Sequence, residues 1–221
     1  MDNSNIQLTI NRIDSLDNMN LEDVSDYMEQ NLQKHVIEYR NWADQFPYHA
    51  LSVFTMAYSQ KYIYIDYFVR CNFLRAVNYT NNSPVSDDSC VEFFMQLPGS
   101  PEYWNFEFNC IGTVNASHRE RRDAPVRLTD EQIASIRRCP SCGTRPFEEM
   151  EGLFSWNLVI AIPFSLIGID ITAPDAPKQI RANFYKCAGK TSMPHFISWA
   201  PIDAEKPNFH RPDCFGIINL N

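Results

Sequence analysis

The sequence predicts an all-β fold, a two-sheet antiparallel β-sandwich with one or two short helices. Three observations support this prediction: segments in which apolar and polar residues alternate, 14 prolines spread along the chain, and an aromatic content of 13%. Alternation is the pattern of strands with one buried face, and aromatic residues favour strands. Many strands with few helical windows indicate two packed sheets.

The chain of 221 residues is expected to form one domain over residues 1–221, because it has no linker and no repeat. Residues 1–40 are predicted to form an N-terminal arm. Within it, residues 6–10 alternate like a strand, and residues 23–32 carry apolar side chains at the spacing of a short helix.

A hairpin and a series of further strands follow the arm. Residues 50–58 and 62–70 alternate with period two on either side of a Ser-Gln-Lys turn, which is the pattern of a β-hairpin. Further strands are expected at residues 89–97, 103–109, 154–163, 179–187 and 196–201.

One helix is predicted with clear end signals, over residues 129–138. Thr129 is a suitable N-cap, and Gln132 completes a capping box with it. Arg137 and Arg138 would lie at the C-terminal end, where basic side chains interact favourably with the helix dipole.

Charge and hydropathy argue against two classes of partner. The formal net charge is −8, and binding to a nucleic-acid backbone needs a basic surface, so no nucleic-acid partner is expected. The basic group Arg119, Arg121 and Arg122 is predicted to be a solvated loop, since acidic residues flank it. The longest apolar stretch, residues 153–171, is interrupted by Pro163 and is predicted to form two pieces of strand, so no membrane span is expected.

Cysteine usage and the N-terminus leave other points open. The seven cysteines are scattered, and their one close pair, Cys139-Pro-Ser-Cys142, lacks the second pair that a structural zinc site needs. We therefore expect reduced, packed thiols. The N-terminus has no signal-peptide pattern, but a removed signal would leave the same sequence, so the compartment stays open. We expect a monomer.

Polar residues at alternate positions of three predicted strands indicate a binding surface. Because side chains alternate between the two faces of a strand, the polar residues of each segment share one face. These residues are Glu92 on the first strand, Asn105, Glu107 and Asn109 on the second, and Arg181, Asn183 and Tyr185 on the third. Amides and carboxylates in a row, next to Arg and Tyr, offer the paired donors and acceptors that sugar hydroxyls need.

Two histidines beside prolines, His195 and His210, have no carboxylate or thiol at metal-ligand or triad spacing. We predict that each makes structural hydrogen bonds. The sequence also lacks nucleophile elbows and phosphate-binding loops.

Several motifs together resemble the family 9 carbohydrate-binding modules, especially the stand-alone relatives from gut Bacteroidetes. The likeness runs from about residue 40 to the C-terminus. It rests on the segments Asn82-Ser83-Pro84-Val85, Asp88-Ser89-Cys90-Val91-Glu92-Phe93-Phe94, Tyr103-Trp104-Asn105-Phe106-Glu107-Phe108-Asn109 with Ile111-Gly112-Thr113, Trp156 to Pro163, Arg181 to Cys187, Pro194 to Trp199, and Pro207 to Pro212 with Phe215-Gly216.

The resemblance implies a β-sandwich whose concave sheet face binds a mono- or oligosaccharide or the end of a polysaccharide chain, without catalysis. It implies that Glu92 and Asn183 contact sugar and that the strand 103–109 supplies further polar contacts. It also implies structural calcium, for which Asp87 and Asp88 offer carboxylate oxygens; no other cofactor is expected.

One position departs from the family pattern. Many relatives have an aromatic residue where this chain has Ser86, and a serine cannot stack on a sugar. The loss of one ring contact costs about 1–2 kcal/mol, or about tenfold in affinity. Trp42, Trp104 and Tyr103 are the rings considered as substitutes.

Two alternatives to sugar binding stay open at this point. The first is a glycoside hydrolase that uses Glu92 and Glu107, because glycosidases need two carboxyl groups across the scissile bond. The second is a protein-interaction sandwich with a degenerate sugar site, for which Ser86 is the indication.

Overall fold

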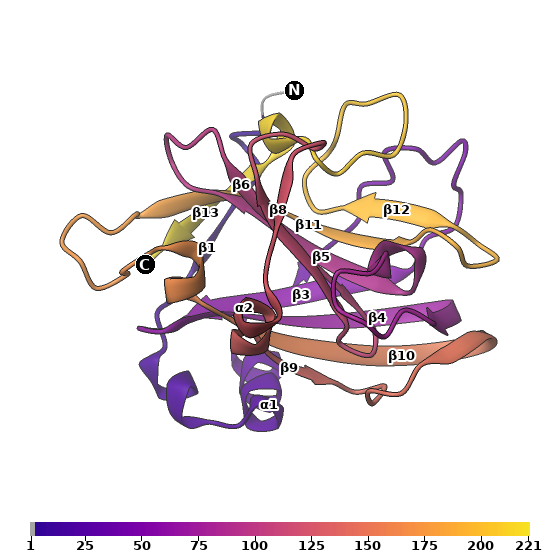
Figure 1. Cartoon of the computed structure of the whole chain (residues 1–221), viewed down its shortest axis with the longest axis horizontal. Helices are drawn as coiled ribbons and strands as arrows, with labels where there is room; N and C mark the ends of the chain where they lie inside the picture. The colour runs from indigo at the N-terminus through magenta and orange to yellow at the C-terminus, as the bar shows by residue number, and fades with distance from the viewer. Residues whose placement is uncertain (1–2) are drawn as a thin grey trace.

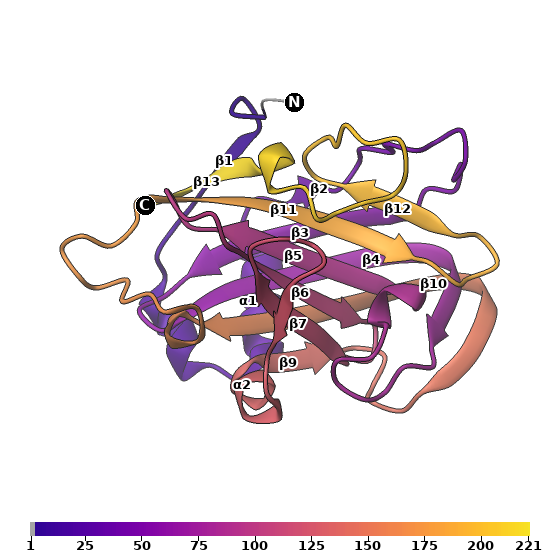
Figure 2. The ribbon, with the colours of Figure 1, turned by 45° about the horizontal axis from the view of Figure 1, so that its top comes forward.

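The computed structural model describes residues 3–221, which form two stacked sheets (Figures 1 and 2). Within these residues, sheet A has the strand order β1-β13-β11-β5-β6-β7-β8, with β12 also paired to β11, and sheet B has the order β2-β3-β4-β10-β9. The predicted all-β sandwich is therefore confirmed. All strand pairs are antiparallel except β1 with β13, which is parallel.

The elements have the following bounds. Sheet A contains β1 (Gln7–Ile10), β5 (Cys90–Gln96), β6 (Tyr103–Asn109), β7 (Val114–Arg119), β8 (Pro125–Arg127), β11 (Gln179–Ala188), β12 (His195–Ser198) and β13 (Gly216–Leu220). Sheet B contains β2 (His35–Val36), β3 (Leu51–Tyr58), β4 (Tyr62–Ala76), β9 (Arg137–Pro140) and β10 (Phe147–Pro163). The α-helices are α1 (Leu21–Asn31) and α2 (Asp130–Ser135), and the 3-10 turns are Asp14–Asn18, Val85–Asp87, Phe164–Ile167 and Pro212–Cys214.

The main core lies between the two sheets. Val91, Phe93 and Met95 of β5 point into it, as the period-two pattern of this strand predicts. At its centre the ring of Phe184 from β11 stacks on that of Phe54 from β3, with centroids 3.7 Å apart. Full burial of such side chains contributes roughly 1.5–3 kcal/mol each.

The N-terminal residues that we predicted as an arm pack onto the rest of the chain. β1 pairs with β13, and Val24 and Met28 of α1 form an apolar cluster with Tyr64 and Val159 of sheet B. The helix begins two residues earlier than predicted, after Asn20, whose side chain accepts a hydrogen bond from the backbone of Asp23. Figure 1 shows α1 against the face of sheet B that points away from sheet A.

Two predicted elements differ from the structure. The capping box of Thr129 and Gln132 is present, but α2 ends at Ser135, so Arg137 and Arg138 do not cap it. They belong instead to β9, a short edge strand that pairs with β10. The chain after Pro163 is a 3-10 turn rather than a second piece of strand. In both places the local pattern does not decide the structure. Residues 137–140 form a strand because β10 is available as a pairing partner, and the residues after Pro163 have no such partner.

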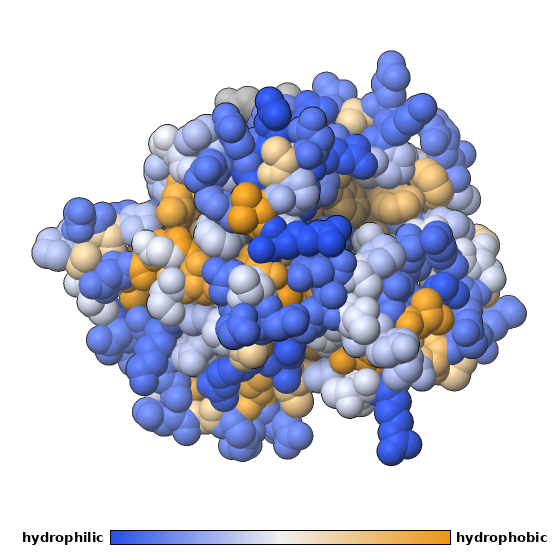
Figure 3. Space-filling view, viewed as in Figure 1, coloured by the Kyte–Doolittle hydropathy of each residue, from blue (hydrophilic) through white to orange (hydrophobic). Residues whose placement is uncertain are grey.

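A second apolar layer covers part of the outer face of sheet A, the face that points away from sheet B. The segment 199–215 runs across this face and places Ile202, Phe209 and Phe215 against Phe94 and Tyr185 of the sheet. The outer face of sheet A, which we expected to be an open concave binding face, is therefore partly covered by this segment. The side of the molecule seen in Figure 3 is mostly hydrophilic, with apolar residues exposed among the polar ones.

No helix in residues 3–221 has the length and apolar character needed to cross a bilayer.

Candidate functional site

Strand register brings several of the predicted site residues into one row on the outer face of sheet A. Glu92 of β5 lies opposite Glu107 of β6 and opposite Tyr185 of β11. Asn115 of β7 continues the row on the far side of Glu107. Directly opposed side chains have Cβ atoms about 4.5–5.5 Å apart, so the two carboxyl groups are neighbours.

Amide groups hold the Glu107 carboxylate. Asn105 Nδ2 donates to Oε1 and Asn115 Nδ2 donates to Oε2, each over 3.0 Å. Burial raises the pKa of Glu107, while these two hydrogen bonds and the charge of Arg119 act in the opposite direction. The carboxylate is thus fixed in one orientation.

Arg119 extends this hydrogen-bond network of Glu107, Asn105 and Asn115. Its Nε donates to Asn105 Oδ1 over 2.8 Å and its Nη1 to the carbonyl of Arg122 over 2.7 Å. The prediction of a solvated loop is wrong for Arg119, which is buried on β7, whereas Arg121 and Arg122 are exposed. Because side chains alternate along β7, every second residue points to the outer face of sheet A, and Arg119 is one of these residues.

Glu92 is only 2% exposed. The Tyr67 hydroxyl of sheet B donates a hydrogen bond to the Glu92 backbone carbonyl over 3.0 Å. This bond connects β5 of sheet A to sheet B through the core. Cys187 Sγ donates to Glu92 Oε1 over 3.0 Å. Burial raises the pKa of the Glu92 carboxyl well above its usual range, and the neighbouring Cys187 and Glu107 raise it further. Burial therefore favours the protonated form of Glu92.

A pocket with a cavity volume of about 130 Å³ opens above these two carboxyl groups. Its lining residues are Ser86, Glu92, Glu107, Arg122, Cys187, Phe196, Pro207, Asn208 and Phe209. It combines acids, an amide, a guanidinium and two phenyl rings, which is the mixture that a polar ligand with an apolar face needs.

The side chain of Asn183, the second residue implied to contact sugar, makes three hydrogen bonds to the backbone. Its Nδ2 donates to the carbonyl of Ala200 over 3.0 Å, and its Oδ1 accepts from the backbone N–H groups of Ala200 and Phe184 over 2.9 Å each. Asn183 therefore anchors the start of the 199–215 segment, and its contact with sugar stays a prediction.

Tyr185 has a similar position under the same segment. Its hydroxyl donates to the Phe209 carbonyl over 3.1 Å, and its ring stacks on that of Phe209 with centroids 4.1 Å apart. Tyr185 is fully buried, so it positions Phe209 at the pocket wall.

Asn109 of β6 and Arg181 of β11 lie outside the row that contains Glu92 and Glu107. Asn109 Nδ2 donates to the carbonyl of Asn78 and to Asp88, and its Oδ1 accepts from the backbone of Thr113. Arg181 Nη1 donates to Gln96 over 3.1 Å. Neither residue lines the pocket, and a sugar contact for either of them stays a prediction.

The aromatic wall of the pocket comes from residues that the strand pattern did not indicate. Phe196 is half-buried, and it meets Phe209 with ring centroids 6.1 Å apart. Both rings lie within the motifs that carry the family resemblance, and this is the signal that points to them. The three rings considered as substitutes for position 86, which are Trp42, Tyr103 and Trp104, do not line the pocket.

The two acidic residues considered for calcium have different partners. Asp87 forms an ion pair with Lys190 over 2.9 Å. Asp88 is fully buried and accepts from two backbone N–H groups, at Val77 and Asn78, and lies 3.3 Å from Arg75 Nε. The expectation of structural calcium stays a prediction.

Both histidines make hydrogen bonds, as predicted. His195 bonds Lys186 Nζ through Nε2 and the carbonyl of Met193 through Nδ1. His210 Nδ1 bonds the Tyr103 hydroxyl over 3.0 Å. All seven cysteines are free and five of them are buried.

We expect protonation of His210 to destabilise the fold in acid. Burial, together with the charges of Arg119 and Arg122, lowers its pKa to about 3. Below pH 6.5 the unfolded chain takes up this proton and the native chain does not, so stability falls between pH 6.5 and 3. The contribution is about 2 kcal/mol between pH 7 and 5. Urea unfolding at a series of pH values should show it as the difference between the wild type and His210→Asn.

The difference in stability between the wild type and His210→Asn also cancels the contribution of the buried acidic groups to the pH dependence. The pKa values of Glu92, Glu107 and Asp66 are raised by burial, so these residues stabilise the fold as the pH falls. They do so equally in both chains. Identical pH profiles for the wild type and the variant would contradict the predicted shift.

The fold and the pocket define a β-sandwich binding protein with a polar and aromatic site on one sheet. The model of the carbohydrate-binding family 9 matches residues 22–220. The chain belongs to this family, as the motifs predicted, and carbohydrate binding is the function of the family. The match begins before the expected residue 40 and includes α1.

Solved structures agree with this assignment. A Bacteroides uniformis protein assigned to carbohydrate binding is 32% identical, with a TM-score of 0.90 over 97% of this chain and 99% of that chain. A family 9 module from Caldicellulosiruptor kristjanssonii, solved with glucose, is 13% identical with a TM-score of 0.55 over 97% and 95%. The structure of such a module from that organism with cellotriose is 14% identical, with a TM-score of 0.54 over 97% and 93%. No curated protein sequence matches the chain.

Proposed function

We propose that the pocket above Glu92 and Glu107 binds a single sugar or the end of a saccharide chain, as a non-catalytic step in polysaccharide breakdown. The observation that carries the proposal is the cross-strand pair of buried carboxyl groups on the floor of a pocket with the half-buried ring of Phe196 in its wall. Sugar rings stack their C–H faces on aromatic rings while their hydroxyls bond to acids and amides.

The shape of the outer face favours a chain end over a long polymer segment. The 199–215 segment covers the sheet around Phe94 and Tyr185, so the accessible polar surface is a pocket and not a groove that runs across the sheet. The complexes of the Caldicellulosiruptor modules contain glucose and cellotriose. These two sugars are therefore the first ligands to test.

Titration calorimetry with glucose and cellotriose, with and without calcium, tests the proposal. We expect micromolar to millimolar affinity, because a small polar ligand on a partly open site binds weakly. Similar affinities for the two sugars would support recognition of one terminal ring. No heat with either sugar or with a broader glycan panel would favour the interaction-protein alternative.

Replacement of Ser86 by tryptophan should strengthen sugar binding by about tenfold, since a ring contact contributes about 1–2 kcal/mol. Ser86 lines the pocket and is half-buried at its rim, so a ring there would face the bound sugar. The matched control is Ser135→Trp, at an exposed position of α2. Equal affinities for both variants and the wild type would place the sugar elsewhere.

The hydrolase alternative has one favourable observation, the opposition of Glu92 and Glu107. Against it, both oxygens of Glu107 already accept amide hydrogen bonds, and the family consists of binding modules. We expect no turnover of a chromogenic glycoside panel. Turnover that disappears in Glu107→Gln would reverse this conclusion.

A further inference from the structure

We propose that Cys90, Glu92 and Cys187 form a binding site for zinc at the floor of the pocket. Within residues 3–221 they are the one group of three or more metal-ligand side chains whose ligand atoms all lie within 4.8 Å of one another. The inference does not depend on whether the pocket binds sugar.

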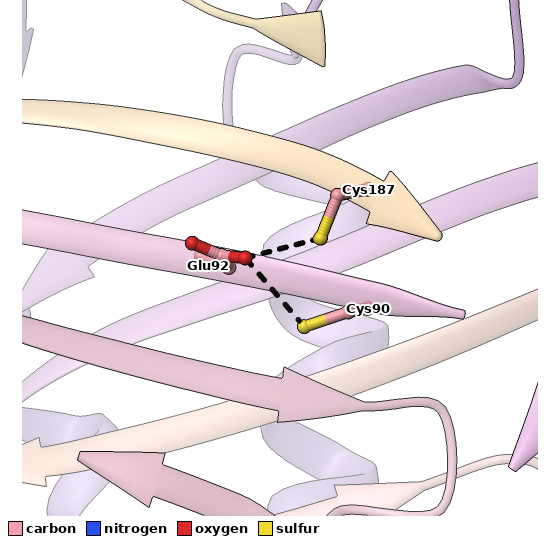
Figure 4. Close-up of side chains that lie close together, drawn as sticks. All are labelled: Cys90, Glu92 and Cys187. Carbon is pink, nitrogen blue, oxygen red and sulfur yellow. Dashed lines mark hydrogen bonds between the residues drawn. The ribbon is translucent and has the colours of Figure 1, made fainter. Parts of the chain in front are cut away.

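The strands place the three ligand atoms without help from a loop. Cys187 of β11 lies directly opposite Cys90 of β5, and Glu92 follows two residues along β5 on the same face. Figure 4 shows both thiols directed at one carboxyl oxygen. Cys187 Sγ lies 3.0 Å and Cys90 Sγ 3.9 Å from Glu92 Oε1.

These separations suit a tetrahedral zinc site. With Zn–S bonds of about 2.3 Å and Zn–O bonds of about 2.0 Å, neighbouring ligand atoms lie about 3.5–3.8 Å apart. The observed separations require shifts of about 1 Å or less to reach this geometry. Rotation of the three side chains, with no change in the strands, can supply such shifts.

The chemistry of the ligands selects the metal. Two thiolates favour a soft or borderline cation such as zinc over calcium or magnesium, which prefer oxygen ligands. Burial raises the pKa values of Cys90, Glu92 and Cys187 and so favours their protonated forms in the absence of metal. Zinc binding would replace these protons, so it should release protons and weaken as the pH falls.

No basic side chain occupies the place of the metal among the described residues. Lys186, next to Cys187 in the chain, projects to the opposite face of β11, where its Nζ bonds the Cys187 carbonyl and His195. Both hydrogen bonds that Glu92 accepts go to Oε1, so Oε2 has no donor within residues 3–221.

The pocket supplies access and the fourth ligand position. Glu92 and Cys187 line it, with total exposed fractions of 2% and 0%. A water molecule in the pocket would complete the coordination, as in zinc sites with three protein ligands and one open position.

Titration of the fully reduced chain with cobalt(II), in a phosphine reductant that does not compete for metal, tests the proposal. We expect one equivalent to bind with a thiolate-to-cobalt charge-transfer absorption, which one equivalent of zinc should abolish. Cys187→Ser and Cys90→Ser should lose this absorption, and zinc should raise the Tm of the wild type but not of these variants.

The matched control is the double variant Cys139→Ser/Cys142→Ser, which removes the Cys-x-x-Cys pair and should bind cobalt like the wild type. Absorption that is lost in this control but kept in Cys187→Ser would overturn the proposal. So would the absence of cobalt binding at millimolar concentration by a reduced chain with a native unfolding transition. A Cys90–Cys187 disulfide in the purified chain, without metal binding after reduction, would instead identify a redox pair.

Discussion

Glu92→Ala is expected to weaken the binding of glucose or cellotriose by about 30-fold, whereas Glu92→Gln should stay within about threefold of the wild type. Alanine removes the hydrogen bonds that the carboxyl group makes to sugar hydroxyls. Two such bonds contribute about 2 kcal/mol in total. Calorimetry in the presence of a metal chelator measures the effect without interference from bound cations.

The contrast between the two variants follows from the protonation state of Glu92. Burial raises the pKa of its carboxyl well above the usual range and so favours the neutral acid. Glutamine reproduces the size and the neutral charge of that acid, and its carbonyl still accepts from the Cys187 thiol. Binding by the glutamine variant should therefore survive.

Two results would contradict this account. Equal losses in both variants would show that an ionised carboxylate is needed, and unchanged binding in Glu92→Ala would place the sugar outside the pocket. Glu102→Ala is the control, because this half-exposed carboxylate pairs only with His118 at the surface. Its affinity should equal that of the wild type.

Asn183→Ala is expected to lower the free energy of unfolding by about 3 kcal/mol, one of the larger effects for a single substitution. The alanine variant leaves the buried N–H groups of Ala200 and Phe184 without an acceptor, whereas the Ala200 carbonyl keeps its hydrogen bond from the Ser198 hydroxyl. In a chain of this size the loss corresponds to a decrease in Tm of roughly 6–12 °C. Urea unfolding and calorimetric melting measure it.

Asn31→Ala is the matched control, since its amide makes one exposed hydrogen bond to the carbonyl of Tyr27. It should change stability by less than about 0.5 kcal/mol. We further expect folded Asn183→Ala to keep its sugar affinity at low temperature. Unchanged stability with lost affinity would instead make Asn183 a direct ligand contact, as the family resemblance implies.

Much of the fold was predictable because its long strands have their own pattern. The hairpin of β3 and β4 and the strands β5, β6 and β11 follow the period-two alternation of their residues. β2, β7, β8, β9 and β13 were missed, although β1 and β12, of four residues each, were predicted. The structure of the missed strands depends on pairing with a neighbour, as β9 shows by extending along β10.

The site was predictable in part for the same reason. Alternation predicts which residues of each strand share a face, and strand pairing in the structure places Glu92, Glu107 and Tyr185 in one row. Phe196 lies in a predicted strand but is not one of the alternating polar residues, and Phe209 comes from the 199–215 segment. No periodic pattern shows which way such a segment folds.

The sequence by itself determined which residues share the outer face of sheet A, because side chains of a strand must alternate. Only the tertiary structure decided which of them a ligand can reach. The 199–215 segment lies over Asn183 and Tyr185 and leaves Glu92 and Glu107 open to the pocket. It is held there by contacts distant in sequence, such as the hydrogen bond from Trp42 Nε1 to the Ala204 carbonyl. Local sequence carries no record of such contacts, since they form only when the sheets have assembled.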